Sequence, residues 1–405
     1  MSFFATVARL VFDALPLAVI RSLVFLVIVS FLISRRRAVE KRILGQCRTP
    51  FWREVAGSAI AGILAGYLGS FILLFLGISI NPHGFIYVLF LALLLTLLDL
   101  RYLCLSYAGG LLALVSLATG VPKIHVTGLM ALIGVLHVTE SVLILLDGDQ
   151  QALPVYLRRP EGTVGGYLLQ RIWPVPLLLL TMIDGTGITG KTYATPGWWP
   201  LIAATLAGVP PGVLVGIYIP AAAALGYGDL ALTGSPRAKA LRTSGLLALY
   251  SVTLMALAVA AGRYPALAWA AALFSPAGHE LVLYLSRRME LYGKPAFGSH
   301  PAGVTILAVM PGSRAAGAGL RAGQVITAVN GRQVRSKGEL VAALDEAAVL
   351  AEITTLPPAG GPERRHEMRG GANRLGIIPA PDPDEPAQVD VGPWHFLPRQ
   401  RTIPP

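Results

Sequence analysis

The chain has 405 residues, of which 54% are hydrophobic and only 14% are charged. Soluble domains carry about 25% charged residues, so this composition, with a mean hydropathy of +0.63, excludes an ordinary soluble protein and predicts a membrane protein. The net charge of +11 does not indicate nucleic-acid binding, because the basic residues stand in short clusters beside apolar runs. The two cysteines, Cys47 and Cys104, match no metal-ligand or redox spacing, and Cys104 is interpreted as a small apolar packing residue.

Apolar runs follow one another through residues 1–288, which we interpret as a multi-span α-helical membrane domain. A helix needs about 20 apolar residues to cross the hydrocarbon core. The predicted spans are residues 16–34, 55–80, 84–100, 103–121, 124–146, 171–186, 199–226, 243–261 and 264–286. Prolines interrupt 171–186 and 199–226, which suggests a re-entrant or tilted segment and a kinked helix, so we expect about six to nine spans. The first run ends in a basic cluster and not at a cleavage site, which predicts an anchor.

Clusters of lysine and arginine predict which loops of the membrane domain face the cytoplasm. The loops with most basic residues are 35–48, 147–170, 227–242 and 287–288. Such an excess is typical of cytoplasmic loops, so we expect these loops and the C-terminal domain to lie in the cytoplasm, beside the anionic lipids of the inner leaflet. Arg21 lies inside the first span and either reaches the headgroups or marks an interfacial helix over the first 15 residues.

One of these loops has the pattern of a β-hairpin. Residues 154–157 and 164–167 flank an Arg-Pro-Glu-Gly sequence, which predicts a short cytoplasmic hairpin near 150–170.

After Arg288 the charge rises and the motifs of a small α/β domain begin. The expected strands and helices are 303–309, 315–320, 325–329, 337–347, 351–356 and 374–378. Together with a Pro-Gly-Ser turn, an Ala-Gly-Leu helix end and a Val-Asn-Gly turn, this order closely resembles bacterial PDZ domains. Ser336 is expected to cap the second helix. Gln324 stands where such domains usually have an Asp that caps a turn, so we expect little functional loss there.

The resemblance implies how a ligand would bind. PDZ domains pair an extended peptide with a strand edge and often hold its terminal carboxylate. In permuted bacterial versions the binding loop comes last, and Leu375-Gly376-Ile377-Ile378 resembles that loop. Leu340 and Leu344, one helical turn apart, would line the groove; the competing interpretation makes both core residues. We assign the PDZ domain to residues 289–380 and expect a disordered, proline-rich tail at 381–405.

A membrane protein with a PDZ domain also suggests a site-2 zinc protease. That chemistry needs two histidines at i, i+4 on one helix, a glutamate base and a further aspartate. The chain offers His279-Glu280, but Leu283 occupies the second ligand position. Leu146-Asp147-Gly148 resembles the Asp-Gly motif but precedes the His-Glu pair, whereas in that family it follows. We therefore predict no catalytic residues, no metal site and no cofactor.

Other polar groups lie inside predicted spans. His125, His137, Glu140 and Ser141 are one set, and Asp184 lies alone. Ionisable groups at membrane depth are costly and often functional. We favour an interhelical hydrogen-bonded cluster that fixes packing. A transporter would use such groups beside broken helices, but the sequence shows no inverted repeat.

Four sequence motifs indicate a resemblance to one protein family. They are His137-Val138-Thr139-Glu140-Ser141, Pro154-Val155-Tyr156, residues 164–176 and residues 275–280. Together they resemble the membrane domain of MinJ-type proteins, which are polytopic PDZ proteins of Gram-positive bacteria.

This resemblance implies a non-enzymatic adaptor or scaffold in division-site selection. The adaptor would bridge a DivIVA-like scaffold and a MinD-like inhibitor, be enriched at the septum and poles of the cell membrane, bind membrane lipids and self-associate. The alternative is a membrane-embedded protease, or a regulator of one, with a degenerate metal site.

Overall fold

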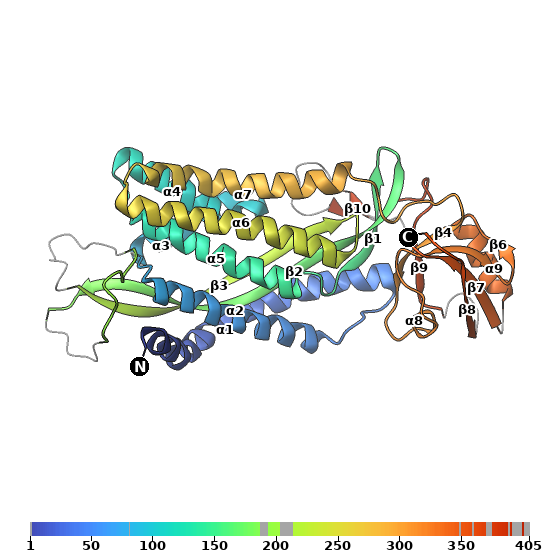
Figure 1. The fold of residues 1–405 in the computed structure, drawn as a ribbon, viewed down its shortest axis with the longest axis horizontal. Helices are drawn as coiled ribbons and strands as arrows, with labels where there is room; N and C mark the ends of the chain where they lie inside the picture. Colours follow the sequence, from blue (N-terminus) through green and yellow to red (C-terminus); the bar gives the residue numbers. More distant parts are fainter. Residues whose placement is uncertain are drawn as a thin grey trace.

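The computed structural model describes residues 2–80, 82–186, 193–202, 214–347, 350–358, 360–369, 375–387, 389–390 and 399–400. The helices before the PDZ domain are α1 (Phe3–Leu44), α2 (Phe51–Leu76), α3 (Pro82–Thr96), the 3-10 helix η1 (Leu100–Leu103), α4 (Leu105–Thr119), α5 (Val126–Asp147), α6 (Pro236–Arg263) and α7 (Leu267–Tyr292). Most of them lie side by side along the long axis (Figure 1). In the described part of the chain, α1, α2, α5 and α6 are long and apolar enough to span a membrane, and α3 and α4 are shorter apolar helices.

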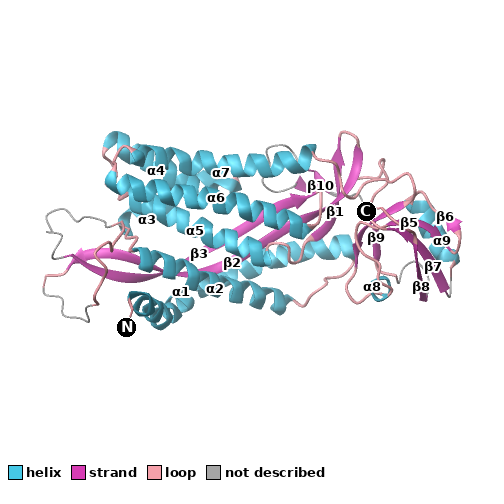
Figure 2. Cartoon of the chain, in the orientation of Figure 1, coloured by secondary structure: helices cyan, strands magenta, loops and turns pink. Residues whose placement is uncertain are grey.

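A long β-hairpin runs among these helices, and it corrects two of the predicted spans. Strands β2 (Gly162–Asp184) and β3 (Leu214–Ala231) pair antiparallel from Tyr167 opposite Ala231 to Asp184 opposite Leu214. Figure 2 shows both strands extending along the helical region. The segment 171–186 and the described part of 199–226 are therefore not transmembrane helices; residues 203–213 lie outside the described residues. Apolar content alone does not separate a buried strand from a buried helix.

The prolines explain why these residues form strands. Pro174 and Pro176 would each remove a hydrogen bond from a helix. The Leu178 amide donates to Ser70 Oγ at 3.0 Å and not to β3, so its backbone points away from β3. Because strand residues alternate, the backbones of Pro174 and Pro176 also point away from β3. Pro220 of β3 lies opposite Leu178 in a pair that is not hydrogen-bonded, so its backbone points away from β2. The prolines thus remove outward-facing donors and leave the β2–β3 ladder intact.

Helix α2 covers the outer edge of β2. Ser58 Oγ donates to the Ile172 carbonyl at 2.5 Å, and Ser70 accepts from Leu178. The two serines lie twelve residues apart along α2, and both bond to the backbone of β2. In a bilayer, non-helical backbone is tolerated only where protein covers it, and these hydroxyls meet that requirement.

Between the two serines, glycines allow α2 to approach the strand closely. A Cβ at Gly62 would lie 2.1 Å from the Pro174 carbonyl oxygen, and one at Gly66 would lie 2.2 Å from that of Pro176. Small residues spaced four apart commonly line such contacts in membranes.

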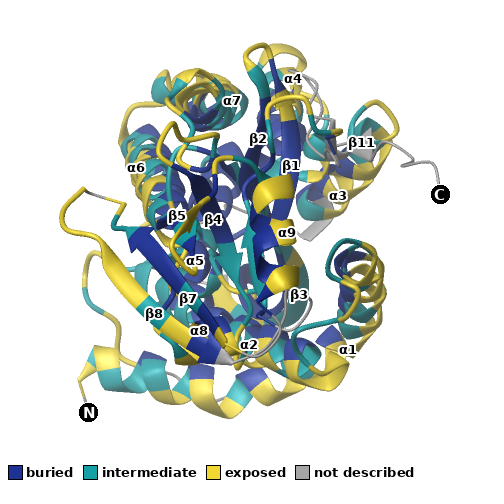
Figure 3. Cartoon of the chain, turned by 90° about the vertical axis from the view of Figure 1, so that its right-hand side faces the viewer, coloured by how far each residue is buried: buried dark blue, intermediate teal, exposed yellow. Residues whose placement is uncertain are grey.

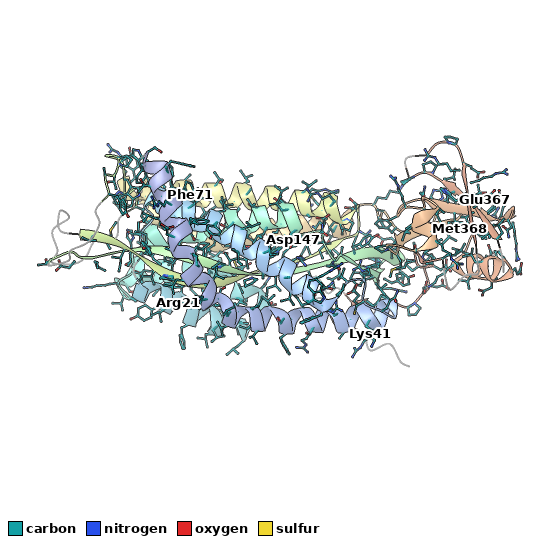
Figure 4. The ribbon with its side chains drawn as sticks, turned by 90° about the horizontal axis from the view of Figure 1, so that it is seen from below. Arg21, Lys41, Phe71, Asp147, Glu367 and Met368 are labelled. Carbon is teal, nitrogen blue, oxygen red and sulfur yellow. The ribbon has the colours of Figure 1, made fainter. Side chains whose placement is uncertain are left out.

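Arg21 is part of the same arrangement. Its guanidinium donates to the Pro220 carbonyl, on the outward-facing edge of β3, at 3.1 Å. Helix α1 is continuous from Phe3 to Leu44 with Pro16 inside it, and Figure 4 shows Arg21 near its bend. Arg21 therefore binds the hairpin, which the sequence did not predict.

The PDZ domain contains β4 (Val304–Val309), α8 (Arg314–Gly317), β5 (Val325–Val329), β6 (Arg332–Gln333), α9 (Lys337–Glu346), β7 (Leu350–Leu356), β8 (Arg364–Arg369) and β9 (Ile377–Pro379). Its sheet has the order β8-β7-β5-β4-β9, with β6 paired to β5. Ser336 Oγ caps α9 by accepting from the Glu339 amide at 3.2 Å. Gln324 Oε1 accepts from the Arg321 amide at 2.8 Å, so this residue caps the turn where an Asp was expected.

The PDZ domain packs against a shorter hairpin, formed by β1 (Leu153–Arg159) and the start of β2. The Gly165 amide donates to the Phe297 carbonyl at 2.7 Å, and the Tyr167 hydroxyl donates to the Leu307 carbonyl. Seen from the PDZ end, β1, β2 and β4 are largely buried (Figure 3).

The segment after the PDZ domain also reaches this hairpin. The Thr163 amide donates to the Pro383 carbonyl at 2.8 Å. The short strand β10 (Val389–Asp390) pairs with β1, and β11 (Arg399–Gln400) pairs with β10. Residues 388, 391–398 and 401–405 of the predicted disordered tail lie outside the described residues.

The basic loops gather at the PDZ end of the molecule. Buried Arg36 pairs with Glu54 at 2.5 Å and donates to the Gln151 carbonyl at 3.0 Å. Arg159 donates to the Gly293 carbonyl, at the end of α7, at 3.0 Å. Figure 4 places Lys41 at the end of α1 nearest the PDZ domain. The loops that the sequence assigned to one side of the membrane are thus neighbours in space.

Candidate peptide-binding groove

Strand β9 is the edge strand at which a PDZ ligand would be added. The Met310 amide donates to the Gly376 carbonyl and the Ala380 amide donates to the Thr305 carbonyl, both at 2.8 Å. Gly376 and Ala380 therefore face β4. Because strand residues alternate, Ile377 and Pro379 turn their backbone groups to the outer edge.

This outer edge is short, and a side chain from the membrane region caps it. Pro379 has no N–H to offer to an added strand. Its carbonyl accepts a hydrogen bond from the Tyr156 hydroxyl at 2.9 Å, and Tyr156 belongs to β1. Backbone pairing with a ligand strand is thus limited to Ile377 in this conformation.

Gly376 has a backbone that a larger residue would not easily adopt. Its φ is +74°, and a Cβ there would lie 2.3 Å from the Ser313 Cβ. The loop preceding β9 therefore depends on glycine at this position. Residues 370–374 lie outside the described residues.

The structure places Leu340 and Leu344 in the core of the PDZ domain. They are 2% and 5% exposed and belong to the same cluster as Leu375, with Ile377 packed partly against it. Ile378 packs instead against the core of the membrane region. Val341, next to Leu340 on α9, is 43% exposed. Val341 lies one helical turn after Lys337, so the two residues share a face of α9.

Lys337 links the start of α9 to this edge. Its ammonium group lies 5.1 Å from the centre of the Tyr156 ring and forms an ion pair with Glu385. Burial lowers the pKa of Lys337, but the bond to Glu385 and the nearby Tyr156 hydroxyl outweigh it and raise this pKa above its usual value. Burial raises the pKa of Tyr156, although the Lys337 charge opposes this shift. Both groups keep their usual charge states at neutral pH.

The residues of the protease alternative have other partners. The Glu280 carboxylate accepts from the Tyr107 hydroxyl at 2.6 Å and pairs with Arg101 at 3.2 Å. Asp147 forms an ion pair with Arg171 and accepts from Trp173 Nε1 at 2.6 Å. Both acids therefore stabilise helix and strand contacts, and this arrangement does not support the protease alternative.

The remaining polar residues separate into different environments. Asp184 is exposed and accepts from the Thr186 amide at 2.9 Å, so it forms a turn and is not a buried membrane group. Ser141 Oγ bonds the Val138 carbonyl of its own helix at 2.7 Å. His125 binds the Ser79 carbonyl at 3.2 Å.

His137 and His279 come together at Cys104, which the sequence had suggested to be an apolar packing residue. Cys104 Sγ lies 3.1 Å from His137 Nε2 and 3.6 Å from His279 Nε2. No local sequence pattern indicates this cluster, because its members come from three separate segments.

Two comparisons with known proteins agree with this description. Residues 305–353 match the PDZ domain family. The chain is 25% identical over 264 residues to the cell division topological determinant MinJ of Bacillus subtilis (strain 168). The match covers 64% of this chain and 63% of MinJ, so it spans less than two thirds of that relative. The chain is thus a helical membrane protein with a C-terminal PDZ domain, and it is similar to MinJ.

Proposed function

We propose that the chain is a non-enzymatic membrane adaptor in bacterial cell division. The helical region anchors it in the cell membrane and the PDZ domain recruits protein partners. The observation that carries this proposal is the combination of a PDZ domain and apolar spanning helices in a chain that is similar to a cell division topological determinant.

The proposed orientation places the PDZ domain in the cytoplasm. The basic loops lie at the PDZ end, where Lys41 lies in the last turn of α1, and cytoplasmic loops carry such an excess of basic residues. In this orientation the domain can meet soluble division proteins. DivIVA-like and MinD-like proteins are the proposed partners, and the septum and poles are the proposed sites of enrichment.

The proposed ligand site is the outer edge of β9 together with α9. Leu375, Gly376, Ile377 and Ile378 form the binding loop and strand, and Leu340 and Leu344 support them from the core. The exposed Val341 is the apolar α9 side chain that a ligand can contact directly. A bound peptide would add a strand beside Ile377 and displace Tyr156 from Pro379 to extend the pairing.

Localisation of the full chain in its native organism tests the division role. A fluorescent fusion of the wild type should concentrate at division septa. A variant that lacks residues 295–405 should remain in the membrane but fail to bring its partner proteins to the septum. An even distribution of the wild type around the membrane, with unaltered division when the gene is deleted, would contradict the proposal.

A further inference from the structure

Three ligand-type side chains converge beside the membrane helices. Cys104 precedes α4, His137 lies in the middle of α5 and His279 lies in the middle of α7. The sulfur and the nearest ring nitrogens all lie within 4.8 Å of one another. Both histidines are buried and Cys104 is half-buried.

The hydrogen bonds of the histidines prepare both rings to bind a cation. His137 Nδ1 lies 2.8 Å from the Ile133 carbonyl, which can only accept, so Nδ1 carries the proton. The Nε2 lone pair of His137 is thereby left facing Cys104. Metal-binding histidines are usually held in this way through their other nitrogen.

The His279 ring is held by two hydrogen bonds in series. His279 Nδ1 lies 3.3 Å from the Tyr107 hydroxyl, and that hydroxyl donates to Glu280 at 2.6 Å. Because the hydroxyl proton goes to Glu280, the Tyr107 oxygen accepts from Nδ1–H. His279 Nε2 therefore also presents a lone pair to Cys104. A carboxylate behind the histidine is a frequent outer-shell partner of metal ligands.

We propose that Cys104, His137 and His279 bind a divalent transition-metal ion of the zinc class. Zinc lies about 2.3 Å from a thiolate and about 2.0–2.1 Å from an imidazole nitrogen, which places tetrahedral ligand atoms roughly 3.5 Å apart. The separations of 3.1 and 3.6 Å from Cys104 Sγ match this geometry. Glu140 Oε2 lies 3.9 Å from His137 Nε2 but outside this group of three, so it is a neighbouring carboxylate.

The charge balance favours a divalent ion at this depth. A thiolate from Cys104 and the neighbouring Glu140 carboxylate carry two negative charges, which one M²⁺ ion beside two neutral imidazoles neutralises. A neutral cluster avoids the cost of placing net charge inside the membrane. The nearby Glu280 is already neutralised by Arg101.

The ion would act as a structural clamp. It would join the segment before α4 to α5 and α7, which are distant in sequence. This role is compatible with a non-enzymatic adaptor and does not depend on the PDZ groove.

Cobalt provides a direct test because it reports its ligands spectroscopically. Full-length protein in detergent is stripped with a chelator and titrated with Co²⁺, followed by Zn²⁺. The proposal predicts about one Co²⁺ per chain, a sulfur-to-cobalt charge-transfer band, four-coordinate visible bands and displacement by Zn²⁺. Cys104→Ser should abolish the charge-transfer band, and His137→Gln should weaken binding by at least about tenfold.

Two control variants distinguish metal binding at this site from metal binding elsewhere in the protein. Cys47→Ser and His125→Gln change the other thiol and another buried histidine, and both should retain the full cobalt spectrum. If Cys104→Ser does not fold, the wild-type spectrum still decides whether a thiolate binds the metal. A folded wild type without a charge-transfer band, or a band lost in Cys47→Ser and kept in Cys104→Ser, would overturn the proposal.

Discussion

The hydroxyl group of Tyr156, in the membrane-region hairpin, donates a 2.9 Å hydrogen bond to the backbone carbonyl of Pro379 in the PDZ domain. This bond lies on the strand edge that a ligand would use. We therefore expect the position of the PDZ domain on the hairpin and the accessibility of the proposed groove to be coupled.

Tyr156→Phe should make the groove more accessible. The substitution removes the hydroxyl bonded to Pro379 and keeps the ring that contacts Lys337. A net hydrogen bond is worth about 1 kcal/mol, so partner affinity for the full-length protein should rise roughly fivefold. Titration calorimetry or biolayer interferometry measures this change. Tyr264→Phe, at an exposed tyrosine, should leave affinity unchanged, and equal affinities for both variants would disprove the coupling.

Gly66→Ala should destabilise the membrane region strongly. The added Cβ would lie 2.2 Å from the Pro176 carbonyl oxygen, so α2 or β2 must move. Overpacking of this kind costs about 1–3 kcal/mol. Gly57→Ala is the matched control on the same helix, since nothing lies within 4 Å of its Cβ, and helix propensity predicts slight stabilisation. In thermal unfolding in detergent, the melting temperature should be highest for Gly57→Ala, slightly lower for the wild type and lowest for Gly66→Ala. Equal melting temperatures would argue against the close contact.

Ser70→Ala should leave the Leu178 amide without its acceptor. This contact is buried, and the amide faces away from the ladder to β3. An unsatisfied buried donor costs about 1–3 kcal/mol. Hydrogen exchange at Leu178 should accelerate and the melting temperature should fall. Ser34→Ala removes an exposed hydroxyl bonded only within α1 and should change neither quantity. Unchanged protection at Leu178 would show that Ser70 does not hold this edge.

Lys239→Ala should destabilise the end of the molecule nearest the PDZ domain. Lys239 is 2% exposed and lies 3.2 Å from Asp229 and 3.7 Å from Glu290. Removing one partner from a buried ion pair costs about 3–5 kcal/mol, because the remaining charges lose their compensation. Protease susceptibility and melting temperature should both report the loss. Lys123→Ala, at an exposed lysine, should behave as wild type, and similar behaviour of both variants would contradict the structural role of Lys239.

The sequence predicted most of the helices but not the long hairpin. Hydropathy identifies apolar segments, and a strand buried on both faces is as apolar as a spanning helix. The signal that could have separated them is the spacing of Pro174 and Pro176, two residues apart, which suits one edge of a strand. The contact between Arg21 and Pro220 depends on tertiary structure, so no local pattern reveals it.

The PDZ domain was predictable because its signals are local. Ser336 caps its helix and Gln324 caps its turn within three residues of each position. The groove was harder to assign, because Leu340 and Val341 are both apolar and only the fold shows which is buried. The Cys104 cluster was missed for a different reason: its ligands lie on three segments, and spacing rules detect only ligands that are close in sequence.

We propose that the PDZ domain of this membrane protein captures division proteins through the groove beside α9. Binding of a DivIVA-like protein from the native organism to the full chain in lipid nanodiscs tests it most directly. Val341→Asp changes an exposed α9 residue, and Leu350→Asp changes an exposed residue at the start of β7 as the matched control. We expect at least about a tenfold loss of affinity for Val341→Asp, equivalent to about 1.4 kcal/mol, and wild-type binding for Leu350→Asp. Wild-type affinity for both variants, or no binding by the wild type to any division protein, would contradict it.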